Sequence, residues 1–142
     1  MGKYIIGRTD IVDFPILELN TIDVKIDTGA YTSSIHCMDI HEEEGKLHCR
    51  FLDPTHPEYN GKQFQFSNYD IAVVKSSNGA VEERYAIRTK IILFGKTFNI
   101  TMTLSSRDEM RFPVLIGRKF LSGKFMVDPQ LQNLSYQAKI KE

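Results

Sequence analysis

One aspartate stands where its carboxylate could act on water. Residues 26–30 read Ile-Asp-Thr-Gly-Ala, directly after the strand-like run 22–26. Gly29 lets the backbone approach closely, and Thr28 can donate hydrogen bonds that lock a turn around Asp27. A carboxylate held in this way can take a proton from water as a general base during hydrolysis. We assign Asp27, Thr28 and Gly29 as candidate catalytic residues; the alternative is a plain β-turn in which the aspartate only caps the backbone.

One arrangement for hydrolysis uses two carboxylates that share one proton, because two carboxylates about 3 Å apart cannot both ionise. The 142 residues contain one Asp-Thr-Gly sequence. A homodimer would place Asp27 beside its symmetry mate and so complete the pair. A monomer would need another group of its own chain, and Asp128, which precedes Pro129, is one such acid.

The hydrophobic pattern around these residues has mostly a period of two, which predicts a β-rich chain. We expect strands at 3–7, 16–19, 22–26, 33–40, 47–52, 69–75, 81–89, 90–94, 97–104, 114–116, 125–128 and 134–136. Residues 53–61 should form a loop, and residues 117–121 a short helix that Gly123 ends. The fold class is therefore all-β: one domain over residues 1–142, a closed barrel or sandwich with one short helix near the C-terminus.

A second segment supports the catalytic interpretation of residues 26–30. Residues 114–121 read Val-Leu-Ile-Gly-Arg-Lys-Phe-Leu. The ordered pair resembles the retropepsins, single-domain aspartic proteases of retroviruses, in which the late segment braces the turn from below. The likeness implies a retropepsin-like fold and a peptidase role. The chain departs from that pattern at Tyr31, where retroviral enzymes have an acid that pairs with the late arginine, here Arg118.

Residues 25–36 are also similar to a bacterial and archaeal family named ATP-dependent zinc proteases. That family includes RimB-type proteins, which accompany the glutamate ligase RimK, and it usually has arginine at the position of Tyr31. Segments 7–8, 105–112 and 125–129 fit the same family, so the likeness covers nearly the whole chain. It implies a peptidase that acts on acidic peptide or on proteins with glutamate tails.

Guanidinium groups bind carboxylates through paired hydrogen bonds, so a cleft for acidic peptide should contain arginine. The candidates for this role are Arg84, Arg107 and Arg118, and the alternative for each is a salt bridge to a nearby acid. The Asn78-Gly79 sequence predicts a tight hairpin that could close over substrate as a flap, or could be an ordinary surface hairpin. Ser76 and Ser77 at its tip could hydrogen-bond a peptide backbone.

Zinc-type ligands are frequent between residues 36 and 56: His36, Cys37, His41, His48, Cys49 and His56. The chain has no Cys-x-x-Cys or His-Glu-x-x-His sequence, and His36 and Cys37 would face opposite sides of a strand. We therefore expect no metal or other cofactor. The alternative is a zinc site that includes His36 and Cys37, and with it a zinc-dependent hydrolase. No Walker sequence is present for ATP.

The composition excludes some partners. The number of lysines plus arginines equals the number of aspartates plus glutamates, at 18 each. The chain therefore has no net positive charge that would favour binding to nucleic acid. No apolar run approaches the ~20 residues of a membrane span, and the N-terminal residues lack a signal-peptide pattern. We expect a cytoplasmic protein with reduced cysteines. A competing hypothesis for the whole chain is a non-catalytic module of the same fold that binds peptide without cleaving it.

Overall fold

The structure is a computed structural model that describes residues 3–75, 78–106 and 111–141. Its strands are β1 (Tyr4–Ile6), β2 (Thr9–Phe14), β3 (Leu19–Asp27), β4 (Ser33–Glu43), β5 (Lys46–Phe51), β6 (Gln63–Phe66), β7 (Asp70–Lys75), β8 (Val81–Leu93), β9 (Lys96–Ser105), β10 (Val114–Gly117) and β11 (Phe125–Val127). Its helices are α1 (Arg118–Leu121) and α2 (Leu134–Ile140). Neither described helix has the length and apolar character needed to cross a membrane.

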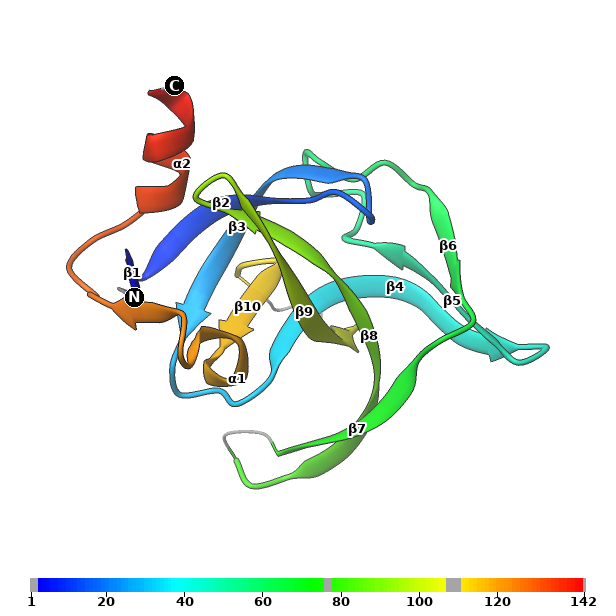
Figure 1. The fold of residues 1–142 in the computed structure, drawn as a ribbon. Helices are drawn as coiled ribbons and strands as arrows, with labels where there is room; N and C mark the ends of the chain where they lie inside the picture. Colours follow the sequence, from blue (N-terminus) through cyan, green and yellow to red (C-terminus); the bar gives the residue numbers. More distant parts are fainter. Residues whose placement is uncertain (1–2, 76–77, 107–110, 142) are drawn as a thin grey trace.

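A closed barrel forms the centre of the molecule. Its hydrogen-bonded strands follow the order β10-β3-β2-β8-β9-β4, and β4 pairs again with β10 to complete the ring (Figure 1). The interior is filled by apolar side chains that alternate along these strands, among them Val24, Ile35, Ile91, Met102 and Ile116. The expected all-β fold with a closed barrel is therefore confirmed, and α1 lies where the short helix was predicted.

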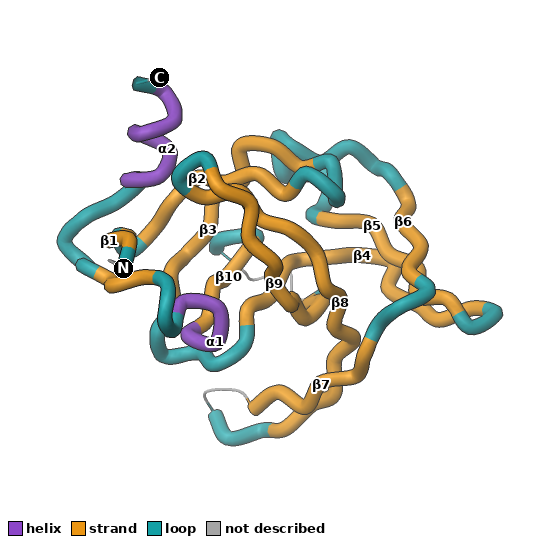
Figure 2. The backbone as a smooth tube through the Cα atoms, viewed as in Figure 1, coloured by secondary structure: helices purple, strands orange, loops and turns teal. Residues whose placement is uncertain are grey.

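Two strand pairs extend beyond the barrel, as the tube in Figure 2 shows. β7 pairs with the first part of β8, in the predicted hairpin that contains Asn78-Gly79. This β7–β8 hairpin projects on the side where the chain leaves β3. β5 and β6 pair in turn beside the outer part of β4, so the β4–β5 hairpin points away from that side.

The separate strand predicted at 16–19 is wrong. Residues 15–18 form the turn between β2 and β3, and these two strands pair with each other. The buried positions of β2 are Asp10, Val12 and Phe14. An aspartate on the buried face interrupts the alternation of apolar and polar residues, which is why the pattern did not reveal this strand.

The strand predicted at 134–136 is also wrong, because these residues begin α2. The buried carboxylate of Asp10 accepts hydrogen bonds from the backbone N–H groups of Ser135 (3.0 Å) and Tyr136 (3.1 Å). These are among the first N–H groups of the helix, which have no partner within it. Asp10 therefore caps a helix more than a hundred residues away, a contact that the local sequence does not indicate.

Replacing Asp10 with alanine should lower the free energy of unfolding by about 1–2 kcal/mol, the usual value of a helix cap. The reason is that Ser135 and Tyr136 would lose their acceptor. Asp10→Asn keeps one side-chain oxygen and should lose less. Urea denaturation measures both variants, and an alanine variant as stable as the wild type would contradict the cap.

The same aspartate should make stability depend on pH. Burial raises the pKa of Asp10 above its ordinary value of 3.8, although three backbone N–H groups oppose the shift. The folded state therefore holds this proton more tightly than the unfolded chain does. The stability of the wild type relative to Asp10→Asn should fall as the pH rises above 3.8. Urea denaturation of both proteins across this range checks the sign, and a rising difference would contradict it.

Candidate active site

The turn after β3 orients the carboxylate of Asp27. The backbone N–H of Gly29 donates to Oδ1 of Asp27 (3.1 Å), and the N–H of Ala30 donates to the Asp27 carbonyl (3.2 Å). The half-buried side chain is thus fixed by the backbone of its own turn. The other carboxylate oxygen, Oδ2, takes no part in these bonds, so it can accept a proton from water.

The segment 114–119 braces this turn from behind. β10 lies parallel to β3, with Gly117 opposite Asp27. The backbone N–H of Arg118 donates to the carbonyl of Ala30 (2.8 Å), and that of Lys119 donates to the carbonyl of Tyr31 (3.0 Å). The predicted pairing of the late Ile-Gly-Arg sequence with the Asp-Thr-Gly turn is therefore present in the structure.

Gly117 is required where the two segments touch. A Cβ atom at this position would lie 2.6 Å from the carbonyl oxygen of Thr32 and 2.7 Å from that of Tyr31. Both oxygens belong to backbone, which cannot move aside without opening the turn. The Gly117 N–H also donates to the hydroxyl of buried Ser33 (3.0 Å), so this residue ties the brace to the start of β4.

The side chain of Arg118 stabilises the turn instead of pairing with an acid. Its guanidinium lies over the ring of Tyr31, with 5.4 Å from Cζ to the ring centroid, and Nη1 donates to the carbonyl of Thr28 (3.4 Å). Attraction between a cation and an aromatic face thus replaces the carboxylate–arginine pair of the retroviral pattern. Thr28 takes part through its carbonyl, whereas we expected its hydroxyl to contribute.

The other predicted substrate residues are dispersed. Arg84, on β8, forms an ion pair with Glu82 two residues earlier. Ser76, Ser77 and Arg107 lie outside the described residues. Of the arginines proposed for acidic substrate, the structure therefore places one at the turn and one beside an acid of its own strand.

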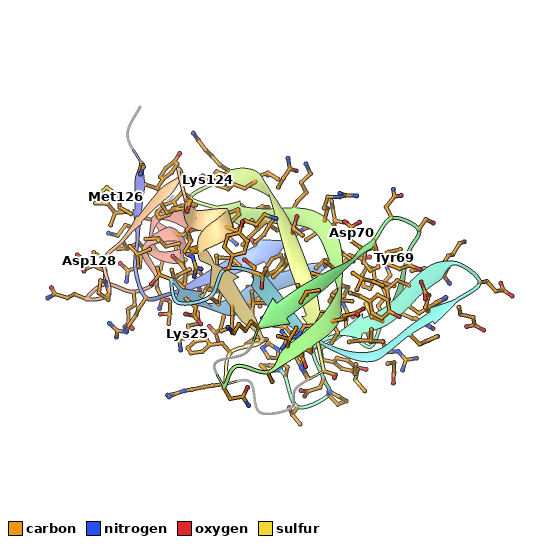
Figure 3. All side chains as sticks on the ribbon, turned by 90° about the horizontal axis from the view of Figure 1, so that it is seen from below. Lys25, Tyr69, Asp70, Lys124, Met126 and Asp128 are labelled. Atoms are coloured by element: carbon orange, nitrogen blue, oxygen red, sulfur yellow. The ribbon has the colours of Figure 1, made fainter. Side chains whose placement is uncertain are left out.

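A basic pocket that the sequence analysis missed lies beside Asp27. It has a volume of about 490 Å³, and the described residues that line it are Arg8, Thr9, Lys25, Ile26, Arg111, Phe112 and Leu115. Among these described residues, three side chains are cationic and none is acidic. Figure 3, which views the barrel from the side of the β7–β8 hairpin, labels Lys25.

The position of Lys25 joins this pocket to the candidate catalytic carboxylate. Lys25 and Asp27 are two residues apart on one strand, so their side chains point to the same face about 7 Å apart. Opposite them on β10 stand Leu115 and Gly117. Arg8 is held in place by hydrogen bonds to Pro129, Gln130 and Gln132. The i, i+2 spacing of Lys25 and Asp27 was the signal in the sequence for a cation near the carboxylate, whereas Arg8 and Arg111 reach the pocket only through the fold.

The residues of the alternative zinc site have other contacts. Nε2 of buried His36 lies 3.0 Å from Oδ2 of Asp53. Cys37 is fully buried near Cys49, and burial raises the pKa of the Cys37 thiol well above its ordinary value. In the described part of the chain, the group of metal-type ligands within reach of one another contains neither His36 nor Cys37.

Comparison with known proteins gives consistent matches. The family described as RimB-like, "Retropepsin-like aspartic endopeptidase RimB", matches residues 5–138. A "Probable alpha-L-glutamate ligase" of Shewanella halifaxensis (strain HAW-EB4) is 37% identical over 134 residues, and a protein of the same name from Desulfotalea psychrophila is 35% identical over 138. These alignments cover 90% and 93% of this chain but 29% of each relative, so the chain spans less than a third of their length.

The fold is also found in a crystal structure of a protein of unknown function from Legionella pneumophila subsp. pneumophila str. Philadelphia 1. The two chains superimpose with a TM-score of 0.70 and 25% sequence identity, covering 94% of this chain and 99% of the other.

Replacing Gly117 with alanine should destabilise the protein by about 1–3 kcal/mol, as overpacking of a tight contact does. The added methyl would press on the carbonyl groups of Thr32 and Tyr31. Gly29→Ala is a matched control, because its Cβ would meet only the Asp27 side chain, at 3.3 Å. Thermal unfolding of both variants gives the comparison, and a Gly117→Ala protein as stable as the control would argue against the brace.

Proposed function

The chain belongs to the RimB-like family of retropepsin-like aspartic endopeptidases, and we propose that it hydrolyses peptide bonds with Asp27 activating the attacking water. The observation that carries this proposal is the braced turn: Oδ1 of Asp27 is fixed by the Gly29 N–H, and Oδ2 is left to receive the proton. A base placed by backbone hydrogen bonds needs little rearrangement before it reacts.

The reaction also needs an acid that polarises the substrate carbonyl. We propose that a second copy of the chain supplies its own Asp27, since two carboxylates that share one proton supply one base and one acid. The ionised Asp27 takes a proton from water as the oxygen attacks the carbonyl carbon. The protonated Asp27 of the other copy gives its proton to the carbonyl oxygen of the substrate. The tetrahedral intermediate then breaks its C–N bond, and a proton passes to the leaving amine.

The pocket beside Asp27 supports an acidic substrate. Arg8, Lys25 and Arg111 bring three positive charges to one cavity in a chain whose net charge is zero. A glutamate side chain next to the scissile bond would be attracted there, and guanidinium groups can hold it through paired hydrogen bonds. Longer proteins named for glutamate ligation contain a segment related to this chain, which also favours a glutamate-containing peptide.

Asp27→Asn should abolish hydrolysis and leave the fold intact, because the amide keeps an oxygen for the Gly29 N–H but cannot take the proton. Cleavage of a glutamate-containing peptide, followed by mass spectrometry, measures the loss, and circular dichroism checks the fold. Unchanged cleavage would exclude Asp27 as the base. Peptide binding of equal affinity in both proteins, with no cleavage by either, would instead favour the binding module. Activity lost to a chelator would favour a zinc hydrolase.

Charge reversal in the pocket should change substrate preference. Lys25→Glu is expected to lower kcat/KM for glutamate-containing peptides by at least ~10-fold, and to affect neutral peptides much less, because an attraction becomes a repulsion. Lys141→Glu is the matched control, since it changes the net charge equally at an exposed position after α2. An equal loss of kcat/KM on acidic and neutral peptides would show that the pocket does not select substrates by their charge.

A further inference from the structure

The outer end of the β4–β5 hairpin carries three side chains that the proposed reaction does not use. They are His41 and Glu43 on β4 and His48 on β5, and one ligand atom from each lies within 4.8 Å of the other two. We propose that these three side chains bind a divalent transition-metal ion, with zinc as the expected occupant. The site lies apart from the candidate active site, because β4 runs away from the turn that holds Asp27 (Figure 1).

The hairpin backbone places the three ligands on one face. Glu44 (φ 52°) and Gly45 (φ 75°) form a two-residue turn with positive φ at both positions, which fixes the register of the strands. In that register His41 stands directly opposite His48, and Glu43, two residues from His41, projects to the same side. Leu47 on the other face is fully buried, so the ligand face points outward to solvent.

The distances fit metal ligation better than direct contact. Nε2 of His41 lies 3.6 Å from Oε2 of Glu43, too far for a hydrogen bond. Ligand atoms ~2.0–2.1 Å from a tetrahedral zinc ion lie roughly 3.3 Å apart, which is close to this separation. The rings of His41 and His48 are stacked and nearly parallel, with centroids 4.8 Å apart. Both rings must rotate before their nitrogens can bind one ion, because each lone pair lies in the plane of its ring.

The surroundings orient the histidines for this role. Nδ1 of His41 lies 3.0 Å from the carbonyl of Asp39, so it donates its proton there and Nε2 keeps the lone pair that a metal needs. The register of β4 shifts between Met38 and His41, and Asp39 has a φ of 55°. This irregularity turns the Asp39 carbonyl toward the ring. The side-chain nitrogen of Gln63 lies 3.5 Å from Nδ1 of His48, and a flip of this amide would place its oxygen there to accept from an Nδ1–H.

The donor set selects the class of ion. Two imidazoles and one carboxylate suit zinc and related transition metals, whereas calcium and magnesium prefer oxygen ligands alone. A His₂Glu set leaves a fourth position for water or for a group of a bound partner. Binding would join the two strands of the hairpin near its tip.

Isothermal titration of the tag-free chain with Zn²⁺ tests this site. We expect saturable binding of one ion per chain. His41→Ala, His48→Ala and Glu43→Gln should each weaken it by at least ~10-fold. His56→Ala is the matched control, because His56 lies in the loop 53–61 and outside the cluster, and it should bind like the wild type. No saturable binding, or equal binding by all these variants, would overturn the proposal.

Cobalt replaces zinc in a second measurement that identifies the ligand atoms. The Co²⁺ spectrum should show nitrogen and oxygen ligation without a thiolate charge-transfer band. Such a band would place the ion at Cys37 and Cys49 and contradict the His–Glu site. Hydrolysis by the wild type should be unchanged by a chelator and in His48→Ala, so the metal site and the proposed peptidase activity can fail independently of one another.

Discussion

The contact between the start of α1 and the turn after β3 is the constraint on which the rest of the site depends. Three backbone N–H groups in a row, from Gly117 to Lys119, donate to the chain that leaves Asp27. This requires the two backbones to approach more closely than any side chain at position 117 would allow. Because β10 pairs with both β3 and β4, the same contact closes the barrel and fixes the direction of the carboxylate.

Charge at the site is arranged locally, since the chain as a whole is neutral. The guanidinium of Arg118 contacts the ring of Tyr31 and the Thr28 carbonyl. It therefore stabilises the turn without needing an acidic partner near Asp27. The cations that line the pocket come instead from three separate parts of the chain, at Arg8, Lys25 and Arg111. Their separation in sequence lets the barrel create a positive cavity with no run of basic residues.

Much of this could be predicted from the sequence wherever the signal is local. The Asp-Thr-Gly turn, the Asn78-Gly79 hairpin and the helix at 117–121 each depend on a few adjacent residues with defined backbone preferences. The predictions fail where a residue distant in the sequence determines the local structure. β2 was missed because its inward-facing Asp10 looks polar, and α2 was taken for a strand because Asp10 supplies its cap. The basic pocket likewise exists only after the barrel brings its three cations together.

The most direct test of the account is whether Asp27 recognises the tetrahedral state of the reaction. A glutamate-containing peptide in which a statine hydroxyl replaces the attacking water should bind the wild-type protein at least ~100-fold more tightly than the same peptide without that hydroxyl. The advantage should disappear in Asp27→Asn, because the hydroxyl would lose its ionised partner. Equal affinities of the two peptides for the wild type, or an advantage that survives in Asp27→Asn, would contradict the assignment of Asp27 as the residue that activates water.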